Sequence, residues 1–251
     1  ISSYTEQGYP EKGLQLFKQM QDKNVKPDKV TVSIVVGACS AICALEEGRE
    51  IHLKIKDGVL ESDIFVESTL VNMYAKCNAL IKAEEVFDEL PYHTVVSWNA
   101  LITGYARSGI YEKVLDFLEK MQLDGIDPTV ITFVCVLKAC GMVRNLDKGH
   151  EIHGKIVEEE FEKEVFVGNS LIDMYAKSGC LAEARRVFDT SVNRDIITWG
   201  TLIGGYTHCE EHSLALDCLN EMQMQGMRPV DAIYTSILSG CGYTGRLADG
   251  Q

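Results

Sequence analysis

The sequence lacks long hydrophobic runs, an excess of basic residues and cysteines paired at short spacing. No apolar stretch approaches the roughly 18 residues that a membrane-spanning helix needs, so we expect a soluble chain. The 24 lysines and arginines face 37 acidic residues, and this net charge of −13 argues at first against a nucleic-acid partner. No two of the nine cysteines are spaced C-x-x-C. We expect reduced core thiols, as at Cys39, Cys135, Cys140 and Cys218, rather than a disulfide framework.

The composition is that of a folded protein, with 46% hydrophobic and 24% charged residues. The chain begins with Ile1, and no charged-then-apolar leader follows it. We therefore expect either a fragment or a chain from which a targeting segment has been removed.

Fixed spacings indicate an internal repeat. Pro27, Pro128 and Pro229 are separated by 101 residues each time. Chance does not place many pairs in one register, so the repeat should decide the fold. The same separation relates Trp98 to Trp199, His52 to His153, Cys39 to Cys140, and Met73-Tyr74-Ala75-Lys76 to Met174-Tyr175-Ala176-Lys177.

The 101-residue period divides into repeats of 35, 35 and 31 residues. We predict one continuous array over the whole chain, cut within a repeat at each end. Its repeats are 1–28, 29–63, 64–94, 95–129, 130–164, 165–195, 196–230 and 231–251.

Each repeat has the pattern of two helices. In residues 165–195, one apolar stripe comprises Phe166, Val167, Leu171, Met174 and Tyr175, and a second comprises Leu181, Ala184, Val187 and Phe188. Gly179 between them is typical of a left-handed residue after a helix, and Asp195 is typical of an N-cap. The second helix should be longer in the 35-residue repeats. A strand at the β-branched runs would not explain the period.

A single helical hairpin cannot bury both its faces, so neighbouring hairpins must stack. The predicted fold is all-α, a right-handed α-solenoid superhelix of helix-turn-helix repeats of 31–35 residues.

The repeats resemble those of pentatricopeptide repeat proteins, in particular the plant organellar subgroup that alternates standard, long and short repeats. The resemblance covers essentially the whole chain. The motifs that carry it are Val95-Val96-Ser97-Trp98-Asn99-Ala100-Leu101-Ile102, Val136-Leu137-Lys138-Ala139-Cys140, Val165-Phe166-Val167-Gly168-Asn169-Ser170-Leu171-Ile172-Asp173-Met174-Tyr175-Ala176-Lys177 and Ala184-Arg185-Arg186-Val187-Phe188-Asp189. A tetratricopeptide array has a similar period but should show a different pattern of small residues.

The resemblance implies binding of single-stranded RNA, one base per repeat, with the RNA 5′ end at the N-terminal repeats. It also implies that the fifth and last residues of a repeat read the base together. The implied pairs are Ser33 with Asp63, Ser68 with Thr94, Asn99 with Thr129, Val134 with Glu164, Asn169 with Asp195, and Gly200 with Val230. For the five repeats from residue 64 to residue 230, the resemblance implies these base preferences in order: a purine, cytidine, a repeat that reads no base, uridine, and any base.

Two further sets of residues recur in register. Apolar residues at the second position are expected to lie between adjacent bases, unless they are core or staple residues: Val30, Phe65, Val96, Ile131, Phe166 and Ile197. Position thirteen carries Lys76, Arg107, Lys177 and His208. The resemblance implies that these cations contact phosphate, whereas the simpler alternative is that they complement a helix C-terminus.

No recurring constellation suits catalysis, so we predict a non-enzyme without a cofactor. The zinc-deaminase signature is absent from the sequence. His150-Glu151-Ile152-His153 has the wrong spacing for a metalloprotease helix, and Gly240-Cys241-Gly242-Tyr243-Thr244-Gly245 follows a predicted helix rather than a strand. Neither a metal site nor a dinucleotide site is predicted.

The resulting prediction is an RNA-binding solenoid that recognises targets for organellar C-to-U RNA editing, with a deaminase domain or editing proteins as partners and no membrane contact. Its expected location is the mitochondrial matrix or the chloroplast stroma. The alternative is a scaffold that binds other proteins.

The first fourteen positions of the repeats hold five cations and four carboxylates, so the acidity lies mainly on the second helices and linkers.

Overall fold

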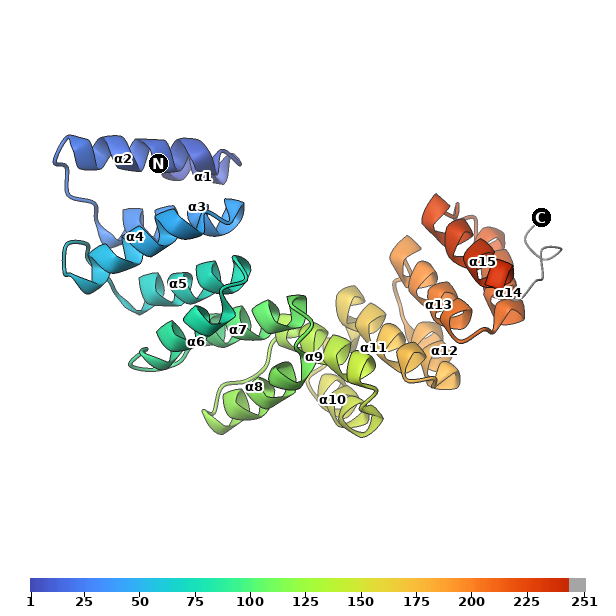
Figure 1. The fold of residues 1–251 in the computed structure, drawn as a ribbon. Helices are drawn as coiled ribbons and strands as arrows, with labels where there is room; N and C mark the ends of the chain where they lie inside the picture. The colour runs from blue at the N-terminus through green and yellow to red at the C-terminus, as the bar shows by residue number, and fades with distance from the viewer. Residues whose placement is uncertain (244–251) are drawn as a thin grey trace. The chain divides into compact units, whose positions relative to one another are not determined.

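The computed structural model describes residues 1–243, with side chains up to residue 239, and every regular element in that stretch is helical (Figure 1). The prediction of an all-α fold is confirmed. The chain forms two compact units, residues 1–128 and the part from residue 129 onward. The glycine motif that ends at Gly245 and the predicted repeat that ends at Gln251 both extend outside the described residues.

The first unit consists of helices that alternate between two layers. The helices α3, α5 and α7 lie side by side, and α4, α6 and α8 each pack against the helix that precedes them in the chain. The bounds are α1 Ser2–Glu6, α2 Pro10–Asp22, α3 Lys29–Ile42, α4 Leu45–Lys56, α5 Ile64–Lys76, α6 Leu80–Asp88, α7 Val95–Arg107 and α8 Tyr111–Leu123.

The second unit repeats this arrangement, with α9, α11, α13 and α15 side by side and α10, α12 and α14 in the other layer. A short 3-10 helix, η1, precedes α11. The bounds are α9 Val130–Val143, α10 Leu146–Glu158, η1 Phe161–Lys163, α11 Val165–Lys177, α12 Leu181–Thr190, α13 Ile196–His208, α14 His212–Met224 and α15 Asp231–Tyr243.

Within each unit, we call the helices of one layer the first helices (α3, α5 and α7 in the first unit; α9, α11, α13 and α15 in the second) and those of the other layer the second helices (α2, α4, α6 and α8; α10, α12 and α14). Each of these first helices begins at a residue predicted to open a repeat. Where neighbouring first helices pack within a unit, their side chains are buried between them. As a result, first helices such as α5 and α11 are buried along most of their length.

Small residues allow neighbouring first helices to approach closely. A Cβ atom at Gly104 of α7 would lie 2.8 Å from the Cβ of Ala75 on α5. In the second unit a Cβ at Gly205 of α13 would lie 2.6 Å from that of Ala176 on α11. Both separations are shorter than van der Waals contact, so these glycines fix the spacing of the layer.

Several sequence expectations about local structure are confirmed. Gly179 has φ +77° after α11, and Asp195 caps α13. The second helices α8, α10 and α14 have 13 residues each, against nine in α6 and ten in α12.

Two expectations about burial were wrong. Cys39, Cys140 and Cys218 are buried as expected, but Cys135 is only partly buried. Phe166, which the pattern places in the apolar stripe of its helix, is 70% exposed. It is the second residue of α11, and its side chain is exposed although the next residue, Val167, is fully buried.

Candidate nucleic-acid interface

The last residue of most predicted repeats is the N-cap of the next first helix. The Asp28 carboxylate accepts from the Thr31 N–H at 2.8 Å, and the Asp195 carboxylate accepts from the Thr198 N–H at 2.8 Å. The Thr94 hydroxyl accepts from the Ser97 N–H at 3.2 Å. These bonds satisfy N–H groups that have no partner within the helix. Local helix chemistry therefore holds the predicted base-reading residues at the N-terminal edge of the first helices.

Asn169 and Asp195 form the best-defined of the predicted pairs. The hydrogen bond to the Thr198 N–H is the main reason that the pKa of Asp195 lies below its usual value, and a hydrogen bond from the Asn169 side chain lowers the pKa further. An ionised carboxylate only accepts, so the amide nitrogen of Asn169 is the group that can donate to Asp195. The Asn169 Oδ1 atom is buried and has no hydrogen-bond partner. Asn169 thus holds a buried acceptor that no other group of the protein uses.

In the two predicted pairs that lie within the first unit, the fifth-position residue is buried. Ser68 is 3% exposed, and its hydroxyl has no partner, while its predicted companion Thr94 caps α7. Ser33 is 7% exposed, and its hydroxyl lies 3.4 Å from that of Thr69 on α5.

Both carboxylate oxygens of Asp63, the predicted partner of Ser33 in base reading, already have hydrogen-bond or ionic partners. Its Oδ1 accepts from the Phe65 and Val66 N–H groups at 3.1 Å, and its Oδ2 lies 3.0 Å from the Lys29 ammonium. The hydrogen bond to Val66 and the contact with Lys29 hold the pKa of Asp63 below its usual value. The Asp63 carboxylate is therefore less available to bind a base than the Asp195 carboxylate is.

The remaining predicted pairs differ in chemistry. Asn99 lies on α7 in the first unit, whereas Thr129 precedes α9 in the second, where its N–H donates to the Thr132 hydroxyl at 2.9 Å. Gly200 has no side chain, and Val230 is 46% exposed. Val134 is partly buried, and Glu164 makes no side-chain cap to α11.

The second-position residues share one property, which is exposure. Each is the second residue of its first helix, and each exposes more than half of its surface. This arrangement rules out the alternative that they are core residues. Their exposed fractions are Val30 61%, Phe65 63%, Val96 55%, Ile131 55%, Phe166 70% and Ile197 58%.

The position-thirteen residues lie at the opposite ends of the first helices. The Arg107 guanidinium donates to the carbonyl oxygen of Ala75 at 3.2 Å and to that of Lys76, which end the neighbouring helix α5. The Lys177 ammonium lies 2.6 Å from Asp173, whereas Lys76 and His208 are exposed. Arg107 therefore does complement a helix C-terminus, but it is the C-terminus of the neighbouring helix α5 and not that of its own helix α7. Sequence reasoning missed this contact because it needs the packing of α7 on α5.

The histidines of the metal-like fragment point to a shared tyrosine. The Nδ1 atoms of His150 and His153 lie 3.1 and 2.8 Å from the Tyr175 hydroxyl. His52 and Tyr74 repeat the contact in the first unit at 3.0 Å. Burial is the main cause that lowers the pKa of His153, followed by the charge of Arg186. Within the described residues, no group of three His, Cys, Asp or Glu side chains could hold a metal ion.

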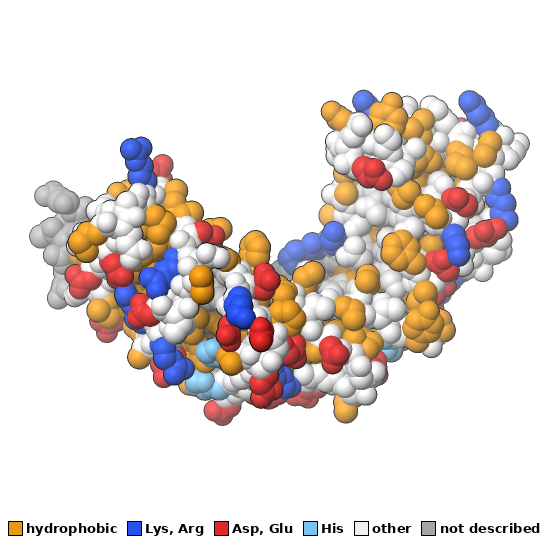
Figure 2. All heavy atoms as spheres, turned by 180° about the vertical axis from the view of Figure 1, so that it is seen from behind, with side chains coloured by type: hydrophobic (Ala, Val, Ile, Leu, Met, Phe, Trp, Pro, Cys, Tyr) orange, Lys and Arg blue, Asp and Glu red, His pale blue; other side chains and the backbone are white. Residues whose placement is uncertain are grey.

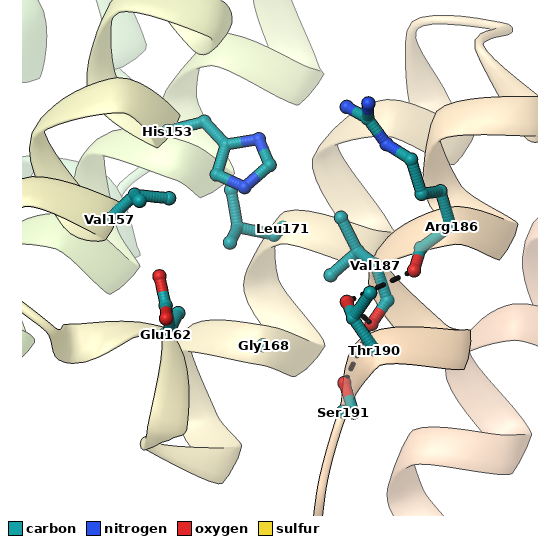
Figure 3. A pocket seen from close by; sticks show the side chains of 9 residues that line it. All are labelled: His153, Val157, Glu162, Gly168, Leu171, Arg186, Val187, Thr190 and Ser191. Atoms are coloured by element: carbon teal, nitrogen blue, oxygen red, sulfur yellow. Dashed lines mark hydrogen bonds between the residues drawn. The ribbon is translucent and has the colours of Figure 1, made fainter.

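His153 also lines a pocket of about 410 Å³ among α10, η1, α11 and α12. Figure 3 shows His153, Glu162 and Arg186 around it. A smaller pocket of about 280 Å³ contains His52 at the equivalent place in the first unit. There Lys56 pairs with Glu89 at 2.8 Å. Both pockets are thus gaps between a second helix and the next repeat, and different side chains line them in the two units.

Charge on the second helices is mixed. Glu46, Glu158 and Glu160 are exposed there or in the following loops, as the sequence predicted, but basic side chains lie among the acidic ones on the face shown in Figure 2. Among residues 1–243, every helix is too short or too polar to cross a lipid bilayer.

Comparison with known proteins identifies the class. Stacked helical hairpins with recurring N-caps and exposed second-position apolar residues define an α-helical repeat protein. The PPR repeat family model matches residues 1–41 and 93–142, and the PPR repeat model matches residues 68–93, 169–196 and 197–227. The chain belongs to the pentatricopeptide repeat family.

Similar proteins include pentatricopeptide repeat-containing proteins of Arabidopsis thaliana. One is 34% identical over 98% of this chain and 34% of its own length. A chloroplastic one is 35% identical over 96% of the chain and 39% of its own length, and a mitochondrial one is 34% identical over 100% and 24%. The chain thus spans about a third of the length of these relatives.

Solved structures with similarity are more distant. The crystal structure of the pentatricopeptide repeat protein PPR10 from maize is 16% identical, covers 99% of this chain and 51% of its own, and has a TM-score of 0.37. The complex of PPR10 with an 18-nucleotide psaJ RNA element is 16% identical over 99% and 53%, with a TM-score of 0.38.

Proposed function

We propose that this chain binds single-stranded RNA along the N-terminal edge of its first helices, one base per repeat. The observation that carries the proposal is the coincidence of two features at this edge. The unused acceptor of Asn169 lies beside the ionised Asp195, and the exposed apolar residues Phe166 and Ile197 follow the N-caps of α11 and α13. Exposed apolar side chains on which bases stack are typical of single-strand recognition, and helical repeats of this class read individual bases.

Uridine is the base that Asn169 and Asp195 fit best. The N3–H group of uridine is a donor, and Asn169 Oδ1 is an acceptor without a partner. Cytidine has an acceptor at N3 and would face Asn169 Oδ1 with like partial charge. Leaving or creating an unpaired polar group costs about 1–3 kcal/mol, so the preference should be about 5-fold or more.

The other repeats are proposed to contribute less selectivity. Ser68 with Thr94 favours a purine and Asn99 with Thr129 a cytidine, while Val134 with Glu164 and Gly200 with Val230 read no base. Ser33 is buried and Asp63 is held by Lys29, so we expect weak selection in that repeat.

Phosphate groups are proposed to contact Lys76, Arg107, Lys177 and His208. Lys76 gives the cleanest test, because Arg107 also binds the end of α5 and Lys177 pairs with Asp173. In Lys76→Ala, affinity should fall similarly for all RNA sequences, and the salt dependence of binding should become shallower by about one ion.

The direct experiment is selection of RNAs from a random pool, followed by fluorescence anisotropy with single-base variants. We expect a uridine at the place that faces α11. Asn169→Ser, which leaves only a small hydroxyl, should move that preference towards a purine. Asn220→Ser makes the same exchange on the exposed part of α14 and should change nothing. An unchanged uridine preference in Asn169→Ser would refute the assignment.

The proposed setting is target recognition for C-to-U RNA editing in an organelle. The alternation of 35-, 35- and 31-residue repeats supports it, as do relatives named as chloroplastic or mitochondrial. The chain is proposed to be a non-enzyme, so a deaminase domain or editing proteins would supply the chemistry. The test is loss of editing at sites matched by the selected RNA when the gene is silenced. Failure to select any RNA sequence would favour the protein scaffold instead.

A further inference from the structure

Two cysteines meet at the C-terminal ends of neighbouring first helices in the first unit. Cys43 follows α3 and Cys77 follows α5, and these helices pack side by side. The Cys43 thiol donates to the carbonyl oxygen of Lys76 at 3.6 Å, and Lys76 directly precedes Cys77. The Cys43 sulfur therefore lies beside the peptide bond that joins Lys76 to Cys77. The two thiols are therefore adjacent although 34 positions separate them in the sequence.

The pair is accessible from one side. Cys43 is exposed and Cys77 is partly buried, whereas the nearby Cys39 is fully buried. A reagent in solution would therefore meet Cys43 first. Burial, and then the neighbouring Cys43, raise the pKa of Cys77 to about 11. The partly buried Cys77 thiol therefore stays protonated near neutral pH and reacts little with reagents in solution by itself.

The repeat itself does not require these cysteines. The equivalent positions in the second unit, 101 residues later, are Arg144 and Ser178. Cys43 and Arg144 both have φ +54°, a left-handed conformation that favours glycine or asparagine over either residue. Backbone geometry thus gives no reason for a thiol at position 43.

We propose that Cys43 and Cys77 form a reversible disulfide that ties the end of α3 to the end of α5 in the presence of an oxidised low-molecular-weight thiol such as glutathione disulfide. The bond needs only a local adjustment of the two side chains, because the Cys43 sulfur already lies 3.6 Å from the carbonyl oxygen of the residue before Cys77 and α3 packs against α5. The proposal concerns covalent chemistry of the chain and does not depend on RNA binding.

The reaction is a pair of thiol–disulfide exchanges. The Cys43 thiolate attacks one sulfur of glutathione disulfide, and a new S–S bond forms while one glutathione thiolate leaves. Cys77 then loses its proton to solvent and attacks the Cys43 sulfur, releasing the second glutathione thiolate. Both cysteines together lose two electrons and two protons, and one glutathione disulfide becomes two glutathiones. Excess reduced glutathione or dithiothreitol reverses both steps.

The test uses the full chain, incubated with glutathione disulfide, then alkylated, digested with trypsin and analysed by mass spectrometry. The peptide of residues 30–49 should be linked to that of residues 77–82, and fragmentation should place the bond at Cys43 rather than Cys39. Reduction should abolish the link. In Cys77→Ser, the link should disappear and Cys43 should carry glutathione.

Three results would overturn the proposal. One is glutathione on Cys43 with a free Cys77 in the unaltered chain. Another is a link that persists in Cys43→Ser, since the bond would then involve Cys39. The third is a disulfide between two chains through Cys43, seen as a dimer on a non-reducing gel. Circular dichroism of the reduced variants checks that each serine exchange leaves the helices intact.

Discussion

Replacement of Asp195 by asparagine should separate helix capping from base reading. In the structure, Asp195 accepts from the Thr198 N–H at 2.8 Å, and the Asn169 side chain also lowers the pKa of Asp195. Asparagine caps helices as well as aspartate does, so stability should change by less than about 0.5 kcal/mol. However, its side chain both donates and accepts. Asn169 can then turn its amide either way, and the acceptor that uridine needs is no longer held in place.

The expected result is a loss of discrimination without a loss of fold. A charge-assisted hydrogen bond contributes about 1.5–3 kcal/mol, which corresponds to roughly 10- to 150-fold in the ratio of the two dissociation constants. The assay measures that ratio by fluorescence anisotropy with two RNAs that differ only by uridine or cytidine opposite α11. Thermal unfolding of the same variant reports on the cap.

Two companion variants make the test decisive. Asp195→Ala removes the cap as well and should cost about 1 kcal/mol of stability. Asn145→Asp makes the reverse exchange at the N-cap of α10, where Asn145 accepts from the Lys148 N–H at 3.1 Å, and should alter neither quantity. The reasoning is wrong if Asp195→Asn keeps the uridine preference of the unaltered chain, or if Asn145→Asp shifts that preference equally.

Three further predictions concern stability. Gly205→Ala should cost about 1–3 kcal/mol in chemical denaturation because its Cβ would meet Ala176, whereas Gly204→Ala, with open space inside the same helix, should stabilise by about 0.5–1 kcal/mol. Arg144→Gly should stabilise by roughly 0.5–1 kcal/mol, since its φ of +54° suits glycine; a lower denaturation midpoint would contradict this. Because burial lowers the pKa of His153, the unfolded chain binds protons more readily, and stability should fall as pH drops below about 6.5. His153→Gln should flatten that dependence, and an unchanged slope would exclude His153 as its source.

The sequence was informative wherever one residue imposes a local geometry. Gly179 and Asp195 could be assigned as helix-ending and helix-capping residues from residue type and position alone, and both assignments are confirmed. Helix type and the difference in helix length between repeats also followed from the spacing. These features depend on neighbours along the chain, which the sequence displays directly.

Features that depend on packing between helices could not be predicted in the same way. The pattern placed Phe166 in an apolar stripe, but only the structure shows that it is 70% exposed. The carbonyl groups that Arg107 binds belong to another helix, and backbone acceptors have no counterpart in the sequence. Likewise, the contact of Tyr175 with two histidines turns a metal-like pattern into a hydrogen-bonded cluster.

The base-reading role proposed for the capping residues would limit how such a chain can change its target. A substitution at Asp63, Thr94 or Asp195 that alters recognition is cheap only if the new side chain can still accept from a backbone N–H, which admits aspartate, asparagine, serine and threonine. Helix capping thus restricts these positions to four residue types. Fifth-position residues such as Asn169 carry no such duty, so new specificities should arise there first during evolution, and engineered ones should be sought there.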